Sequence, residues 1–157
     1  MKAFINNTAY DFIQGETMLD FVRRIENNQQ AIPTMCQDNR LENFGSCRVC
    51  SVEVAREKDG STKTMASCHT PISEGLYIYH NTERIQKLRK NIVELVLTDY
   101  PADKIFPSKD KKATSFQETI AQIGIPTIRY PKGKNHLKIE PDRAHPYIKS
   151  DLSQCIN

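Results

Sequence analysis

The sequence has few of the features that define several large classes of protein. No apolar run approaches the roughly 18 residues needed to cross a bilayer, which excludes a transmembrane segment. The N-terminus lacks the apolar stretch of a secretory signal peptide, so we expect a cytoplasmic protein. With 6 glycines, 8 prolines and no internal repeat in 157 residues, collagen-like, coiled-coil and low-complexity chains are excluded.

Motifs for nucleotide binding and for nucleophilic catalysis are absent as well. The chain has no glycine-rich phosphate loop and no serine nucleophile elbow, so the sequence offers no catalytic residues. Charge is uneven, with a formal net charge of −2 over residues 1–80 and +5 over residues 81–157. The basic run of Lys109, Lys111 and Lys112 is typical of a solvated face, and we expect no nucleic-acid partner.

Cysteine is the most informative residue type. The chain holds five cysteines, and an odd number without an export signal favours metal binding or a reactive thiol over a disulfide framework. Ten, two and seventeen residues separate four of them, which are Cys36, Cys47, Cys50 and Cys68. Thiolates are soft ligands that select zinc, copper(I) or iron–sulfur centres.

The cysteine spacing leaves two interpretations open. A zinc ribbon requires two C-x2-C pairs, and only Cys47 and Cys50 form one. A plant-type [2Fe–2S] site uses one spread cysteine, one C-x2-C pair and a distant fourth cysteine, which is the order here. The first gap is longer than the four residues typical of plant ferredoxins. A zinc-stabilised interaction or nucleic-acid module is therefore the alternative to an iron–sulfur domain.

Small residues before Cys47 favour the iron–sulfur alternative. Gly45 and Ser46 allow backbone N–H groups to approach an anionic cluster closely, and Arg48 adds a positive charge nearby. Hydrogen bonds to cluster sulfurs stabilise the reduced, more negative state. We therefore expect Gly45, Ser46 and Arg48 to surround a cluster that the four cysteines bind.

The expected fold is α+β, a β-grasp domain over residues 1–81. A helix should begin at Thr17 and end before Pro33, and residues 36–48 should form a loop. Asn6-Asn7 and Asp59-Gly60 are turn signals. Alternating apolar residues predict strands at about residues 3–6, 10–13, 49–55, 62–66 and 76–80.

Residues 82–157 should form a helix followed by an irregular extension. The helix is expected to begin at Thr82 and to end near Asp99, with a short second helix opened by a Ser115–Glu118 capping box and closed by Gly124. Prolines and charges after Pro126 predict irregular chain. The apolar face of the first helix should comprise Ile85, Leu88, Ile92, Leu95 and Val96.

Three segments carry a resemblance to a known family. They are Ile32–Cys36, Gly45–Val54 and Ala66–Pro71. They resemble the ferredoxin domain that opens the large iron–sulfur subunit of respiratory complex I, related hydrogenase subunits and the catalytic subunit of NAD-linked formate dehydrogenases. The resemblance covers nearly the whole chain.

The resemblance implies a β-grasp [2Fe–2S] domain that passes single electrons and performs no bond chemistry. It also implies that Cys36 and Cys47 bind one iron and that Cys50 and Cys68 bind the other. The implied partners are downstream domains of a parent chain and a flavin- and NAD-binding redox subunit.

The sequence departs from the family pattern after the long helix. Where a His-x3-Cys would contribute to a [4Fe–4S] cluster, the chain has Asp99–Asp103 instead, and a basic insert follows over residues 104–135. This departure most resembles some formate dehydrogenase catalytic subunits. The alternatives are a complex I subunit, an NAD-linked hydrogenase subunit and a stand-alone ferredoxin.

The last residues resemble the start of another cluster motif. The segment 150–157 is similar to the approach to a C-x2-C-x2-C motif that is broken after Cys155. We therefore expect an N-terminal piece of a longer protein, in which a [4Fe–4S] cluster begins at Cys155.

Overall fold

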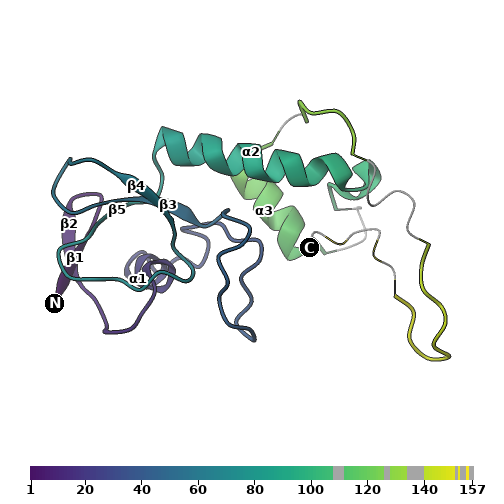
Figure 1. The fold of residues 1–157 in the computed structure, drawn as a ribbon, viewed down its shortest axis with the longest axis horizontal. Coiled ribbons are helices and arrows are strands. Elements are labelled where there is room, and N and C mark those ends of the chain that lie inside the picture. The colour runs from purple at the N-terminus through teal and green to yellow at the C-terminus, as the bar shows by residue number, and fades with distance from the viewer. Residues whose placement is uncertain (108–111, 126–127, 134–139, 151, 153–154, 156–157) are drawn as a thin grey trace. The chain divides into compact units, whose positions relative to one another are not determined.

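The chain forms two compact units in the computed structural model, Met1–Arg89 and Lys90–Asn157 (Figure 1). The structure describes residues 1–107, 112–125, 128–133, 140–150, 152 and 155. No helix among these described residues is both long and apolar enough to cross a bilayer.

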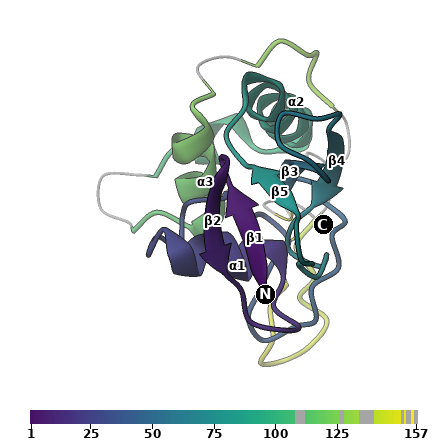
Figure 2. The ribbon, with the colours of Figure 1, turned by 90° about the vertical axis from the view of Figure 1, so that its left-hand side faces the viewer.

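The first unit is built on a mixed sheet of five strands in the order β2-β1-β5-β3-β4. The pairing of β1 with β5 is parallel and the other three pairings are antiparallel (Figure 2). This arrangement confirms the expected α+β, β-grasp fold. The strands are β1 (Lys2–Ile5), β2 (Thr8–Asp11), β3 (Ser51–Ala55), β4 (Lys63–Ala66) and β5 (Tyr77–Tyr79).

Asn6 and Asn7 form the predicted turn between β1 and β2. Their φ angles are 47° and 70°, and two residues with positive φ are what a two-residue hairpin requires. Pairing therefore resumes at once, with Ile5 opposite Thr8. The predicted return strand is confirmed, but its predicted bounds of residues 10–13 were wrong by two residues, because β2 spans Thr8–Asp11.

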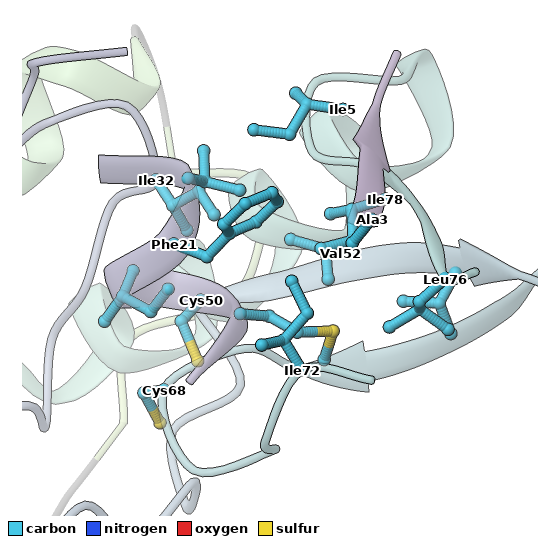
Figure 3. Close-up of a cluster of buried hydrophobic side chains, with 14 of the residues drawn as sticks. Ala3, Ile5, Phe21, Ile32, Cys50, Val52, Cys68, Ile72, Leu76 and Ile78 are labelled. Carbon is cyan, nitrogen blue, oxygen red and sulfur yellow. The ribbon is translucent and has the colours of Figure 1, made fainter. Parts of the chain in front are cut away.

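Helix α1 (Met18–Ile25) supplies the apolar layer against the sheet. Thr17 caps it as predicted, because its hydroxyl oxygen accepts a hydrogen bond from the Asp20 backbone N–H at 3.2 Å. Phe21 is fully buried and lies among side chains of the sheet such as Val52 and Ile78 (Figure 3). The core therefore lies between α1 and the central strands.

Helix α2 (Glu83–Asp99) begins in the first unit and continues into the second. The predicted apolar face is partly wrong, since Leu95 is 54% exposed. The buried row follows a strict four-residue spacing instead, through Ile85, Arg89, Val93 and Leu97. Hydrophobic periodicity could not select this row, because one of its members is an arginine.

The second unit contains a short 3-10 helix, Ala102–Lys104, and helix α3 (Ser115–Ile123). The capping box is formed by Thr114 and Gln117, not by the predicted Ser115 and Glu118. Gly124 closes α3 with a φ of 70°, as expected. The described residues after Pro126 contain no helix or strand, only one isolated bridge between Asp142 and Ser150.

Candidate metal centre

The four clustered cysteines lie around one end of β3. Cys36 and Cys47 belong to the irregular segment between α1 and β3, and both are half-buried. Cys50 immediately precedes β3, Cys68 follows β4 by two residues, and each is 1% exposed. All four are free thiols. Figure 3 shows Cys50 and Cys68 beside the apolar core of the first unit.

The thiols influence one another's pKa most clearly in two pairs. The neighbouring Cys47 thiol lowers the pKa of Cys36, and the Cys36 sulfur raises the pKa of Cys47. The neighbouring Cys50 sulfur raises the pKa of Cys68. The two pairs are also close enough for the Cys36 sulfur to raise the pKa of Cys68. The site is therefore one patch of sulfur made of two adjacent pairs.

Backbone N–H groups surround these sulfurs. The Ser46 and Cys47 N–H groups donate to the Cys36 sulfur, and the Val49 N–H group donates to the Cys47 sulfur. Burial raises the pKa of the Cys36 thiol, but these hydrogen bonds outweigh burial and leave that pKa below its ordinary value. Donors aimed at sulfur stabilise a thiolate, which is the form that binds metal.

The pKa values of two of the thiols are raised. Burial, followed by the neighbouring Cys50 sulfur, raises the pKa of the Cys68 thiol to about 12, while the Gly45 N–H group opposes the shift. Burial likewise raises the pKa of Cys47 above its ordinary value. Thiols in this surrounding stay protonated unless a cation compensates the charge of the thiolate. A positive centre between the sulfurs would stabilise the thiolate form of both residues.

Gly45 lies at a point where backbone approaches the site closely. Its φ is +69°, and a Cβ added there would lie 3.1 Å from the Nδ1 atom of His69. Its N–H group donates to the Cys68 sulfur. Only glycine combines this left-handed conformation with so little space.

The other two residues expected beside the site differ from each other. Ser46 contacts the Cys36 sulfur through both its backbone and its side chain. The Arg48 side chain is exposed, and the role of this residue in the fold is a turn with a φ of 63°, where its carbonyl oxygen accepts from the Ser51 hydroxyl at 2.7 Å. The Cys47 and Val49 N–H groups were not predicted, since every residue type supplies them.

The strands β3 and β4 hold the two buried cysteines in place. Ser67 donates to the Cys50 carbonyl oxygen twice, from its hydroxyl at 2.7 Å and from its backbone N–H at 3.3 Å. The Ser67 carbonyl oxygen in turn accepts from the Leu19 N–H at 3.1 Å, at the start of α1. Cys50 and Cys68 are thus fixed to one another and to the helix.

Two arginines that the sequence analysis did not single out donate hydrogen bonds to the chain next to Cys36 and Cys50. Arg23 of α1 donates to the Ile32 carbonyl oxygen at 3.1 Å and to the Thr34 hydroxyl at 3.3 Å, on the approach to Cys36. Arg89 of α2 donates to carbonyl oxygens on both sides of Cys50. No sequence signal marks either arginine, because hydrophobic periodicity does not select a charged residue.

This arrangement fits a two-iron centre better than a single zinc ion. A structural zinc ribbon uses two C-x2-C pairs around one point, and only Cys47 and Cys50 form such a pair. Two adjacent cysteine pairs, surrounded by N–H donors, match a [2Fe–2S] cluster, in which each iron takes two protein sulfurs.

The described part of the second half offers no comparable site. At the position of the family's His-x3-Cys, Tyr100 is buried and packs edge-on against Phe116, with ring centroids 5.1 Å apart. Cys155 is half-buried, and most of the segment around it lies outside the described residues, so the [4Fe–4S] cluster expected there stays a prediction. Lys109 and Lys111 also lie outside the described residues.

Comparison with known proteins identifies the first unit. Residues 2–83 match the family described as the 2Fe-2S iron-sulfur cluster binding domain. Across 99% of its length, the chain is also similar to the crystal structure of an NAD+-reducing [NiFe]-hydrogenase in the H2-reduced state. The TM-score is 0.79 with 21% sequence identity, and the match covers 61% of that chain. At this level of identity the likeness concerns the fold.

Two curated relatives extend beyond this unit. An NADH-quinone oxidoreductase subunit of Rickettsia felis is 32% identical over 157 residues, which is 99% of this chain and 22% of the relative. The alpha subunit of the NADPH-Fe(3+) oxidoreductase of Geobacter sulfurreducens is 31% identical over 126 residues, which is 80% of this chain and 14% of the relative. The chain spans less than a quarter of the length of either relative.

Proposed function

The chain belongs to the family of 2Fe-2S iron-sulfur cluster binding domains, and from this premise we propose that its first unit carries single electrons for a larger oxidoreductase. The cluster, when bound, supplies a one-electron change at iron without making or breaking a bond in a substrate. The proposed ligands are Cys36, Cys47, Cys50 and Cys68.

The gathering of four free thiols at one end of β3, inside the segment that matches the 2Fe-2S family, is the observation that carries the proposal. Cys36 with Cys47, and Cys50 with Cys68, are neighbours, and they are also the pairs expected to share an iron. The chain's own contribution is to aim N–H groups at the sulfurs and to exclude water from the inner pair. The outer pair, Cys36 and Cys47, is half-buried and therefore lies nearer to solvent.

We propose that the larger enzyme is an NADH- or NADPH-linked oxidoreductase of the kind represented by the two curated relatives. Its electrons would arrive from a flavin- and NAD-binding subunit and leave through later domains. The names of these relatives favour the complex I alternative over formate dehydrogenase. Formate dehydrogenase stays a prediction that rests on the missing His-x3-Cys and on the basic insert over residues 104–135.

The experiment is an anaerobic reductive titration of the reconstituted protein, followed by visible absorption and by EPR. We expect a brown protein that takes up about one electron per chain and then shows a rhombic EPR signal. A colourless protein that holds one zinc ion per chain, or a brown protein that takes up no electron, would contradict the proposal.

A further inference from the structure

The guanidinium of Arg89 is a buried cation next to the backbone of Cys50, which is one of the two buried cysteines. Arg89 is 4% exposed although it is one of the most strongly solvated residue types. Its Nε–H donates to the Val49 carbonyl oxygen at 3.1 Å, and its Nη2–H donates to the Ser51 carbonyl oxygen at 2.8 Å. The guanidinium therefore spans the backbone of Cys50.

This cation lacks the usual partner of a buried arginine. In the part of the first unit that the structure describes, no Asp or Glu side chain forms an ion pair with Arg89. Two carbonyl oxygens satisfy its hydrogen bonds but do not neutralise its charge. An uncompensated buried charge is costly, so the fold must supply an anion nearby.

The candidate for that anion is the sulfur of Cys50. Burial lowers the pKa of Arg89 to about 10, and the Cys50 sulfur opposes that change. Arg89 therefore stays protonated at neutral pH and interacts electrostatically with the sulfur that it lies behind. Because this interaction runs through the low-dielectric interior, solvent screens it far less than it screens a surface charge.

We infer that Arg89 sets the reduction potential of the cluster by stabilising its reduced state. The inference rests on the proposed function, since it concerns the charge on a cluster held by Cys50. One-electron reduction makes the four-thiolate centre more negative by one charge and breaks no bond. A fixed cation behind it favours that state, so the cluster accepts an electron more readily than it would without Arg89.

The test compares three variants of the full chain by EPR-monitored redox titration. Arg89→Gln removes the charge and retains hydrogen-bond donors. Arg89→Lys keeps the charge but loses the planar fork. Lys87→Gln, two residues away on the same helix, removes an equal charge from an exposed position.

We expect Arg89→Gln to lower the equilibrium constant for reduction of the cluster about tenfold. For a one-electron couple this is a fall of about 59 mV in midpoint potential. Arg89→Lys should stay within about threefold of the parent, and Lys87→Gln within about twofold, because water screens an exposed charge. A loaded Arg89→Gln protein with the parental potential would overturn the inference. So would a loaded Arg89→Lys protein that shifts as far as Arg89→Gln.

Failure to assemble is also decisive. If Arg89→Gln holds no iron, Arg89→Lys is the deciding variant, and the inference requires it to load and to keep the parental potential. An Arg89→Lys protein that also holds no iron would show that Arg89 supports the Cys50 backbone and nothing more. A parent protein without a two-iron cluster would instead contradict the proposed function itself, which keeps the two failures distinct.

Discussion

At the scale of single residues, the site depends on backbone N–H groups that only a particular chain path can aim at sulfur. Gly45 shows this most clearly, because its backbone is left-handed and an added Cβ would lie only 3.1 Å from the Nδ1 atom of His69. The cysteines supply the ligands, but the residues between them decide whether a thiolate is stabilised. Substitutions between the ligands should therefore affect the cluster almost as much as substitutions of the ligands.

Gly45→Ala should weaken cluster binding. The left-handed conformation alone costs an alanine about 1–2 kcal/mol, and the contact with His69 adds to that cost. Gly75→Ala is the matched control, since Gly75 has a φ of +73° and no heavy atom within 4 Å of an added Cβ. We expect both variants to lower thermal stability, but only Gly45→Ala to lose iron several-fold faster to a chelator. Equal rates of iron loss would contradict this role for Gly45.

Cys68→Ser should abolish stable cluster binding. Serine keeps the shape of the side chain but replaces a soft thiolate with a poor ligand in a fully buried position. Cys155→Ser is the control, because Cys155 belongs to the other unit. Iron and acid-labile sulfide per chain should fall below about a tenth of the parental values in Cys68→Ser. In Cys155→Ser they should not change, and a matching fall there would refute the assignment.

At the scale of elements, local signals in the sequence predict most of the first unit. Thr17 caps α1, and Asn6-Asn7 turns the chain, because each needs only its immediate neighbours. The capping box of α3 shows the limit of such signals. Thr114–Gln117 and Ser115–Glu118 both fit the capping-box pattern. The local sequence does not decide which pair forms the box, and in the structure it is Thr114–Gln117.

The buried row of α2 shows a second limit of sequence analysis. Arg89 lies on the buried row although the predicted apolar face did not include it, and its acceptors come from a segment about forty positions earlier. A contact between residues so far apart in the sequence produces no local pattern from which it could be predicted. The same holds for the thiol pairs, since the spacing of the cysteines predicts that they gather but does not settle which sulfurs meet.

Glu53 of β3 binds side chains near the starts of β4 and α2, and its charge should make the stability of the fold depend on pH. Burial raises the pKa of Glu53, but hydrogen bonds from the Thr82 and Thr62 hydroxyls and the ion pair with Arg84 leave it below its ordinary value of 4.5. A lowered pKa in the folded state stabilises the fold above pH 4.5, and this contribution is lost as the pH falls through the folded-state pKa.

Glu53→Gln should therefore reduce the free energy of unfolding by about 1–3 kcal/mol at neutral pH. The difference from the parent should shrink as the pH falls below 4.5 and through the lowered folded-state pKa, because the parental carboxylate is then protonated too. Glu74→Gln, at an exposed position, is the control and should follow the parent throughout. Denaturant unfolding measured at several pH values tests this, and a difference that grows on acidification would contradict it.

At the scale of the whole molecule, the two units have different features. The first unit contains every proposed cluster ligand. The second contains an ion pair between Arg129 and Glu94, which we call the clamp. The Arg129 backbone N–H and its Nε–H donate to the Glu94 carboxylate at 2.7 and 2.9 Å, and its Nη2–H donates to Asn91 at 2.6 Å. This clamp ties the irregular segment after α3 to the second half of α2.

Arg129→Gln should loosen that segment without disturbing the cluster. We expect limited proteolysis after α3 to become several-fold faster, because exposed irregular chain is the preferred site of cleavage. Iron content and midpoint potential should match the parent. Lys132→Gln, nearby and exposed, should change neither cleavage nor iron content. Loss of iron in Arg129→Gln would show that the units are coupled.

The central claim is that four cysteines in two pairs hold a two-iron, one-electron centre. Mössbauer spectroscopy of protein reconstituted with isotopically enriched iron tests it most directly, because it counts and distinguishes the iron sites. The account predicts two sulfur-coordinated irons per chain, both Fe(III) before reduction and one Fe(III) with one Fe(II) afterwards. A single iron site per chain, or a four-iron spectrum, would contradict it.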